Sequence, residues 1–179
     1  MLPKKAREGN DEGTEGGAEG GSVLRLEPMD QAAYAAWRGY IEHEYGQDKV
    51  RAGNWQPEDA DRLAHEAFEE FLPQGLATPD HELQVMVNDA DERVGMVWTT
   101  IQEREPGRVV FIYDIEVDEA HRRRGYARLA LAEIERRAAD SGCMGVMLHV
   151  FGDNAAAREL YRSAGFVETN VVMLKRIDG

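Results

Sequence analysis

Three consecutive arginines stand immediately before a stretch with helical spacing. The run from Arg122 to Arg124 precedes Gly125, and the apolar residues after it predict a helix over 125–139. The first amides of a helix lack internal partners and lie at the positive end of its dipole, so such a start attracts anions. Gly125 lets the backbone approach a ligand closely, and guanidinium groups bind phosphate oxygens in pairs. The pattern predicts a site for a pyrophosphate or similar anion, although an arginine run alone is also typical of a solvated surface.

Two common phosphate-binding loops are absent from the sequence. It contains neither G-x-x-x-x-G-K-[ST] nor G-x-G-x-x-G, so neither an ATPase nor a dinucleotide-binding protein is supported. The 21 basic and 34 acidic residues give a formal net charge of −13, which argues against general nucleic-acid binding. An acidic chain attracts cationic partners and so favours an amine substrate, and acidity for solubility alone is the alternative.

Two spaced stretches resemble the motifs of one family. Arg122-x-x-Gly125-x-Ala127, which opens a helix after a hydrophobic strand, resembles the R/Q-x-x-G-x-G/A pyrophosphate-binding motif of the GNAT superfamily of acyl-CoA-dependent N-acyltransferases. Residues 148–170 resemble the strand, Asn-capped helix and L-Y-x-x-x-G-F turn of the same superfamily. The matching residues there are Asn154, Ala157, Leu160, Tyr161, Gly165 and Phe166. The resemblance covers residues 23–177 and is strongest over 108–170.

The resemblance implies an α/β (α+β) fold in a single domain. Its mixed, mostly antiparallel sheet would have splayed central strands and about four flanking helices. The strand before the arginines and the strand at 145–151 would part and leave a V-shaped gap for the acyl-CoA. Backbone groups of Ile115 and Val117 would pair with the pantetheine arm. The amides that would hold the pyrophosphate are those of Arg122, Arg123, Arg124, Gly125, Tyr126 and Ala127.

Two further residues receive roles from the resemblance. Asn154 would bond the pantetheine, and its chemistry also suits a helix N-cap, which does not exclude the first role. Tyr161 matches the tyrosine that protonates the departing thiolate, and packing in the core beside Leu160 is the alternative. A backbone amide of the splayed strand would stabilise the oxyanion.

The position of the catalytic base departs from the family pattern. Many relatives carry a glutamate or histidine where this chain has Tyr113. A strand bulge could turn the neighbouring Asp114 or Glu116 toward the substrate, and burial would raise the pKa of a carboxyl to a useful value. Ordinary alternation instead places both carboxylates on the face opposite Tyr113 and Ile115. Asp114 and Glu116 are therefore the catalytic candidates, and a chain of ordered waters is the alternative to a dedicated base.

Periodicity predicts the elements that must position these residues. Strands are expected at 23–27, 82–89, 93–103, 108–117, 145–151 and 166–177. Helices are expected at 30–51, 57–73, 125–139 and 153–163, with Asp30 as the first N-cap and Gly165 after the last helix. This order predicts a mixed sheet with helices packed on it.

Composition sets the remaining expectations. Apolar residues at 42% and charged residues at 31% are typical of a soluble domain, and the apolar runs fall short of the ~18 residues of a membrane span. A single cysteine, Cys143, and a start without a signal-peptide core favour a cytoplasmic setting. Residues 1–22, rich in glycine, predict a flexible tail before an N-acetyltransferase domain at 23–179. A structural role rather than metal binding is expected for His43, His65, His81, His121 and His149.

The sequence therefore predicts an N-acetyltransferase that transfers an acetyl group from acetyl-CoA to a primary amine by direct attack in a ternary complex. The expected acceptor is a small cationic amine, such as an aminoglycoside-like molecule or a polyamine. No metal, nucleic acid or membrane is expected to take part, and a homodimer stays open. The alternatives are a protein N-terminal or lysine acetyltransferase and a non-catalytic acyl-CoA sensor domain.

Overall fold

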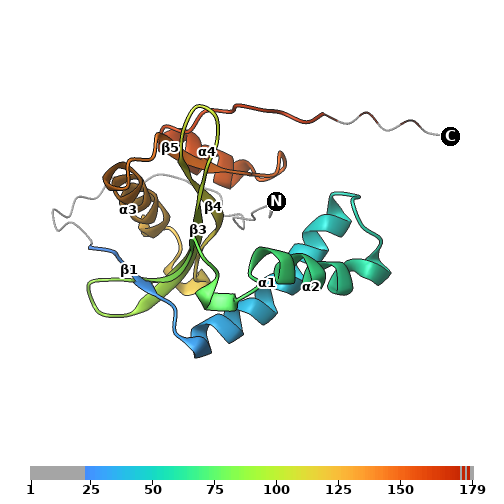
Figure 1. Ribbon diagram of the computed structural model, residues 1–179, viewed down its shortest axis with the longest axis horizontal. Helices are drawn as coiled ribbons and strands as arrows, with labels where there is room; N and C mark the ends of the chain where they lie inside the picture. Colours follow the sequence, from blue (N-terminus) through green and yellow to red (C-terminus); the bar gives the residue numbers. More distant parts are fainter. Residues whose placement is uncertain (1–22, 174, 176, 178–179) are drawn as a thin grey trace.

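Five strands form one mixed sheet in the computed structural model, which describes residues 23–173, 175 and 177. The sheet order follows the chain, and every neighbouring pair is antiparallel except the last, which is parallel (Figure 1). The strands are β1 (Arg25–Pro28), β2 (His81–Val87), β3 (Arg93–Gln102), β4 (Val109–Val117) and β5 (Gly145–Leu148). The predicted mixed, mostly antiparallel sheet is confirmed.

Four α-helices accompany the sheet, as the sequence predicted. They are α1 (Gln31–Arg51), α2 (Ala60–Phe71), α3 (Tyr126–Asp140) and α4 (Ala155–Ser163). The carboxylate of Asp30 accepts the Ala33 amide at 2.7 Å and so caps α1 as expected. In α2 the buried residues recur every four positions, which gives this short helix one apolar face: Ala60, Ala64 and Phe68.

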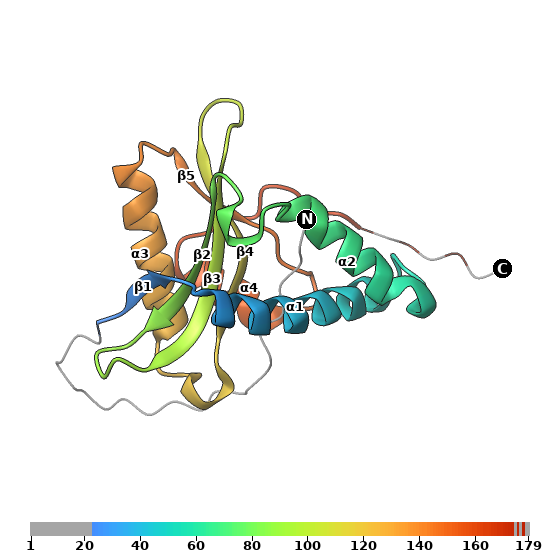
Figure 2. The ribbon, with the colours of Figure 1, turned by 60° about the horizontal axis from the view of Figure 1, so that its bottom comes forward.

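The helices cover the sheet on both faces and create two separate cores. Figure 2 shows α3 on one side of the sheet and α1 with α2 on the other. The α3 core contains, among others, Leu26, Met86, Val97, Ile112, Leu131, Ile134 and Tyr161. The α1–α2 core contains Trp37, Tyr45, Phe68, Leu83, Met96 and Trp98. Each face of the sheet is therefore stabilised by its own set of buried side chains.

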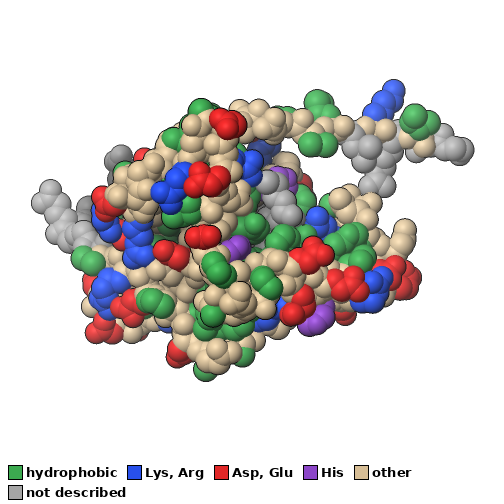
Figure 3. All heavy atoms as spheres, viewed as in Figure 1, with side chains coloured by type: hydrophobic (Ala, Val, Ile, Leu, Met, Phe, Trp, Pro, Cys, Tyr) green, Lys and Arg blue, Asp and Glu red, His purple; other side chains and the backbone are tan. Residues whose placement is uncertain are grey.

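The C-terminal segment departs from the prediction. A strand was expected at 166–177, but none of the described residues of this range belongs to a strand. Its apolar side chains are exposed, with Val172 97% and Met173 90% accessible, and Figure 3 shows them along the segment that runs from α4 toward the C-terminus. The run contains strand-favouring valines, but a strand also needs a neighbour to take its backbone hydrogen bonds. The tail expected at 1–22 lies outside the described residues.

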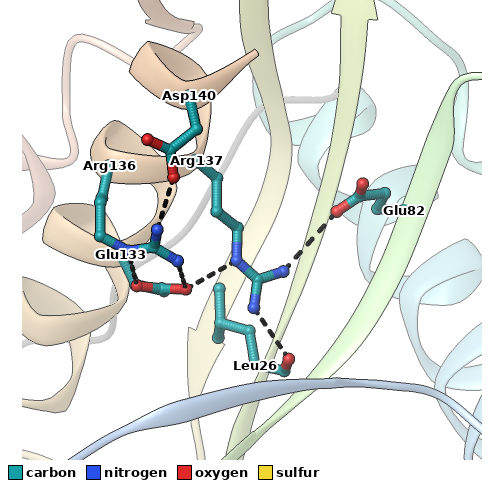
Figure 4. Close-up of polar contacts among 6 residues, drawn as sticks. All are labelled: Leu26, Glu82, Glu133, Arg136, Arg137 and Asp140. Atoms are coloured by element: carbon teal, nitrogen blue, oxygen red, sulfur yellow. Dashed lines mark hydrogen bonds and ion pairs between the residues drawn. The ribbon is translucent and has the colours of Figure 1, made fainter.

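Arg137 ties α3 to the far edge of the sheet (Figure 4). Its guanidinium donates to the Leu26 carbonyl of β1 at 3.0 Å and to Glu133 at 2.7 Å, and it lies 3.9 Å from Glu82 of β2. Hydrogen bonds from Arg136 and from Arg137 lower the pKa of the Glu133 carboxyl from 4.5 to about 2. Glu133 therefore holds the side chain that joins the helix to β1 and β2.

We expect Glu133→Gln to lower the free energy of unfolding at neutral pH by about 1 kcal/mol, because the carboxylate that accepts three hydrogen bonds from Arg136 and Arg137 is lost. The folded pKa lies below the unfolded one, so the stabilisation is complete above pH 4.5 and is lost as the pH falls toward 2. Urea unfolding of both proteins between neutral and acidic pH measures this difference. A difference that stays constant over that range would contradict the assignment.

Candidate active site

The parallel strands β4 and β5 pair over only part of their course. Their register begins with Val109 beside Gly145 and ends with Ile112 beside Leu148. Beyond this point β4 continues to Val117 along β3, while β5 ends. Among the described strands, none lies beside the second edge of β4 over residues 113–117. The expected parting of these two strands is therefore present, although β5 is the edge strand of the described sheet and not a central one. The parting also explains why β5 is shorter than predicted.

A β-bulge interrupts β4 at the same point. Asp114 pairs with Trp98 of β3 and Ile112 pairs with Thr99, so Tyr113 is an extra residue. The Tyr113 ring stacks on Trp98 with ring centroids 4.5 Å apart in the α1–α2 core. The Asp114 side chain lies on the same face of the sheet as Tyr113, where its carboxylate accepts a hydrogen bond from the Trp37 indole of α1 at 3.5 Å. The simple alternation that would separate Tyr113 from Asp114 is thus broken.

Both candidate carboxylates lie on the α1–α2 face of the sheet. Asp114 is only 6% exposed. Glu116 is half-buried and accepts hydrogen bonds from the Tyr40 hydroxyl at 3.4 Å and the Arg122 guanidinium at 3.5 Å. The structure therefore brings Asp114 and Glu116 to the face that α1 covers, while the side chains of Ile115 and Val117 pack into the α3 core.

The loop between β4 and α3 exposes the start of that helix. It contains a short 3₁₀ turn, Glu119–His121, and two residues in the left-handed region, Arg123 with φ 65° and Gly125 with φ 85°. A Cβ atom at Gly125 would meet nothing within 4 Å, so the backbone there is open. The first turn of α3 carries no acidic residue. This geometry suits an anion on the helix amides.

The arginine run divides into two parts. Arg122 is held against β4, because its Nε donates to the Val117 carbonyl at 3.0 Å. Arg123 and Arg124 are exposed beside Gly125. The side chain of Tyr126 is buried, and its hydroxyl lies 3.5 Å from the Asn88 amide nitrogen. Tyr126 can therefore offer only its backbone to a ligand, and Arg122 fixes the loop beside the end of β4.

Helix α4 carries the two remaining candidates. The Asn154 side chain accepts a hydrogen bond from the Ala157 amide at 3.0 Å. Asn154 is therefore the N-cap of α4, as predicted. Tyr161 is 3% exposed and its ring lies 5.6 Å from that of Phe166. Burial, and secondarily the charge of Asp114, raise the pKa of the Tyr161 phenol above its usual value of 10.0. The phenol therefore keeps its proton at neutral pH, and it lies within the electrostatic reach of Asp114.

The structure brings to this region three residues for which the sequence predicted no role at the site. The Trp37 indole and the Tyr40 hydroxyl of α1 donate hydrogen bonds to Asp114 and Glu116, respectively. His149 follows the last paired residue of β5. The available signal for His149 was its polarity inside the otherwise apolar run GVMLHVF.

A separate cavity of about 270 Å³ lies at the opposite end of α3. It is lined by residues of β2, β3 and the end of α3, including Glu82, Gln84, Thr99 and Arg137. Neither the bulge of β4 nor the Gly125 loop contributes to it. The unpaired part of β4, not this cavity, adjoins the candidate carboxylates and Tyr161.

Within the described part of the chain, no group of three or more His, Cys, Asp or Glu side chains is arranged to hold a metal ion. In the same residues, no helix has the length and apolar character needed to cross a bilayer.

Comparison with known proteins identifies the family. The profile of the Acetyltransferase (GNAT) family matches residues 36–166. The sequence is 38% identical over 155 residues to YycN, an uncharacterized N-acetyltransferase of Bacillus subtilis (strain 168), covering 87% of this chain and 99% of that protein. YdgE, another uncharacterized N-acetyltransferase of the same strain, is 32% identical over 155 residues with the same coverage. The chain belongs to the GNAT family and is an acyltransferase.

Solved structures agree with this assignment. The crystal structure of YycN from Bacillus subtilis has a TM-score of 0.82 at 38% identity, and the match covers 88% of this chain and 100% of that one. The aminoglycoside N-acetyltransferase AAC(6')-Iy in complex with CoA has a TM-score of 0.56 at 19% identity, covering 89% of this chain and 98% of that one. The second likeness is one of fold alone.

Proposed function

We propose that this protein transfers an acetyl group from acetyl-CoA to the primary amine of a small cationic molecule, by direct attack in a ternary complex. The observation that carries the proposal is the unpaired edge of β4, which ends beside the open start of α3. In this arrangement the backbone of Ile115 and Val117 pairs with the pantetheine arm. The amides from Arg122 to Ala127 bind the pyrophosphate, with Arg123 and Arg124 as charged partners.

The residues at the proposed site fit an acyl-CoA. The Gly125 backbone is open and left-handed, so a diphosphate can approach the helix amides without meeting a side chain. Asn154 fixes the start of α4 and is a candidate to bond the pantetheine as well. Family members use acetyl-CoA, which supplies the reactive thioester. The protein then has to orient the amine, stabilise the oxyanion and move protons.

Tyr161 is the proposed proton donor to the departing thiolate. Its raised pKa keeps the phenol protonated at neutral pH, which an acid requires. The buried position beside Asp114 also keeps water away from the sulfur atom. Asp114 and Glu116 are proposed to hold or deprotonate the acceptor, since both lie on the face that α1 covers.

The choice of acceptor rests on charge. The formal net charge of −13 and the two carboxylates on the acceptor face favour a cation. One solved structure of AAC(6')-Iy holds a bisubstrate analogue, CoA-S-monomethyl-acetylneamine, but at 21% identity it supports the fold only. The competing acceptor is a protein N-terminus or lysine. The competing function is a non-catalytic acyl-CoA sensor. It is favoured by Tyr113, which stands where many relatives carry a glutamate or histidine as the base.

A binding and transfer experiment with the full chain tests the proposal. We expect isothermal titration to show acetyl-CoA binding, and thiol release to follow with spermidine or neamine as acceptor. Activity confined to a peptide with a free N-terminus and a lysine would replace the small-amine acceptor with a protein. Binding without transfer to any of these amines, even at elevated pH, would identify a sensor domain, and no binding would refute the proposal.

Two loop variants test whether the backbone, more than a guanidinium, binds the phosphates. We expect Gly125→Val to weaken CoA binding about tenfold or more, because valine strongly disfavours the left-handed conformation. Arg123→Ala removes one exposed charge and should weaken binding about threefold or less. Isothermal titration gives both dissociation constants, and thermal melting checks the folds. Equal constants for the two variants would contradict this account.

Removal of one hydroxyl tests the proton donor. Tyr161→Phe keeps the ring against Phe166, so acetyl-CoA affinity should stay within about twofold while kcat falls about 10²-fold. Steady-state thiol release and isothermal titration measure the two quantities. An unchanged kcat would assign Tyr161 to packing alone.

A further inference from the structure

His149 has a ring nitrogen that none of the described residues satisfies. Its Nδ1 atom is buried and has no hydrogen-bond partner among the described residues. By contrast, the ring of His81 accepts the indole N–H of Trp98 at 2.8 Å, as a structural histidine does. A buried polar atom without a partner costs free energy, and such atoms concentrate at functional sites. The hydrogen bond expected of a structural histidine is therefore missing at the Nδ1 atom of His149 among the described residues.

The position of His149 places it at the gap between the strands. Leu148 is the last residue of β5 that pairs with β4, so His149 lies across from Tyr113 at the first unpaired level. Leu148 packs into the α3 core, and alternation directs the next side chain to the α1–α2 face. The charge of Lys49 on α1 acts on the His149 ring, which agrees with that direction. Tyr113, Asp114 and His149 thus border the same gap on one face.

The environment keeps the ring neutral. Burial lowers the pKa of His149 below its usual value of 6.5, and the positive charge of Lys49 lowers it further. Lys49 is itself half-buried over the rings of Tyr45 and Trp55, at 5.2 and 5.6 Å, which fixes its place beside the site. At neutral pH the imidazole is therefore a free base, and it can accept a proton from a bound ammonium group.

We propose that His149 is the general base that deprotonates the acceptor amine, across the gap from the position where Tyr113 replaces the base of many relatives. This inference rests on the proposed function of the site. Asp114 and Glu116 are less suited to the task, because the Trp37 indole and the Tyr40 and Arg122 side chains already donate hydrogen bonds to them. They instead hold the cationic acceptor beside the ring.

The proton balance follows from this assignment. The ammonium group gives one proton to the His149 imidazole, which later releases it to solvent. The neutral nitrogen forms a bond to the thioester carbonyl carbon, and the carbon–sulfur bond breaks. Tyr161 donates its proton to the departing sulfur and regains one from the nitrogen of the new amide. The products are the acetylated amine, the CoA thiol and one proton released.

A matched pair of histidine variants tests the proposal. His121 also has a buried Nδ1 atom without a partner among the described residues, but its ring lies near the start of α3, with its centroid 6.4 Å from that of Tyr126. With the best amine of the panel above as probe, we expect His149→Gln to lower kcat/KM about 10²-fold and His121→Gln to lower it less than about twofold. Acetyl-CoA affinity, measured by isothermal titration, should stay within about twofold of wild type in His149→Gln.

The pH profile separates a base from a structural residue. In the wild type, kcat/KM should fall as the pH drops through the pKa of His149, and an NMR titration of the His149 ring should give the same midpoint. The pH profile of His149→Gln should lack this fall in kcat/KM at acidic pH. Its kcat/KM should also approach that of the wild type at high pH, where the amine binds in its neutral form. His149→Asn provides a second variant if the glutamine protein does not fold.

The outcomes distinguish the two proposals. If the wild type transfers no acetyl group to any amine, the proposed function fails. If the wild type is active and the folded His149 variants keep both its kcat/KM and its acidic limb, the function stands and the assignment of His149 is wrong. A limb whose midpoint differs from the NMR titration of His149 would likewise overturn the assignment.

Discussion

The parting of β4 and β5 after Ile112 and Leu148 is the constraint on which the rest of the site depends. Two parallel strands that stayed paired would satisfy each other's backbone groups and leave nothing for a ligand to bind. Once they part, the amides and carbonyls along one edge of β4 need another partner. The bulge at Tyr113 begins at the same level, turns Asp114 toward α1 and lets β4 stay on β3 while it leaves β5.

The order of the helices and strands as far as α4, and the family, could be predicted from the sequence. The spacing of Arg122, Gly125 and Ala127, together with the run from Asn154 to Phe166, gave the GNAT resemblance that the family profile confirms. These motifs are local, because a helix start and a helix end are fixed by a few neighbouring residues. Asp30 and Asn154 cap their helices as their side-chain chemistry predicted. The roles assigned to individual site residues stay predictions.

What could not be predicted depends on contacts between distant segments. A bulge is a mismatch between two strands, so the sequence of β4 alone could not say that Tyr113 is the extra residue. That no described residue is a partner of the His149 Nδ1 atom depends on the packing around the ring, which the spacing of residues does not reveal. The residues after Gly165 include strand-favouring valines, but composition does not supply the neighbour that a strand requires. Local pattern was therefore reliable for helices and misleading at the edge of the sheet.

The division of the interior into two cores has a consequence for how this protein can change. The α3 core supports the loop around Gly125, whereas the α1–α2 core supports the face that carries Asp114 and Glu116. The sheet separates them, so repacking α1 and α2 need not move the start of α3. Substitutions on the two faces can therefore accumulate independently, so the shape and charge of the α1–α2 face can change while the backbone at the start of α3 keeps its conformation.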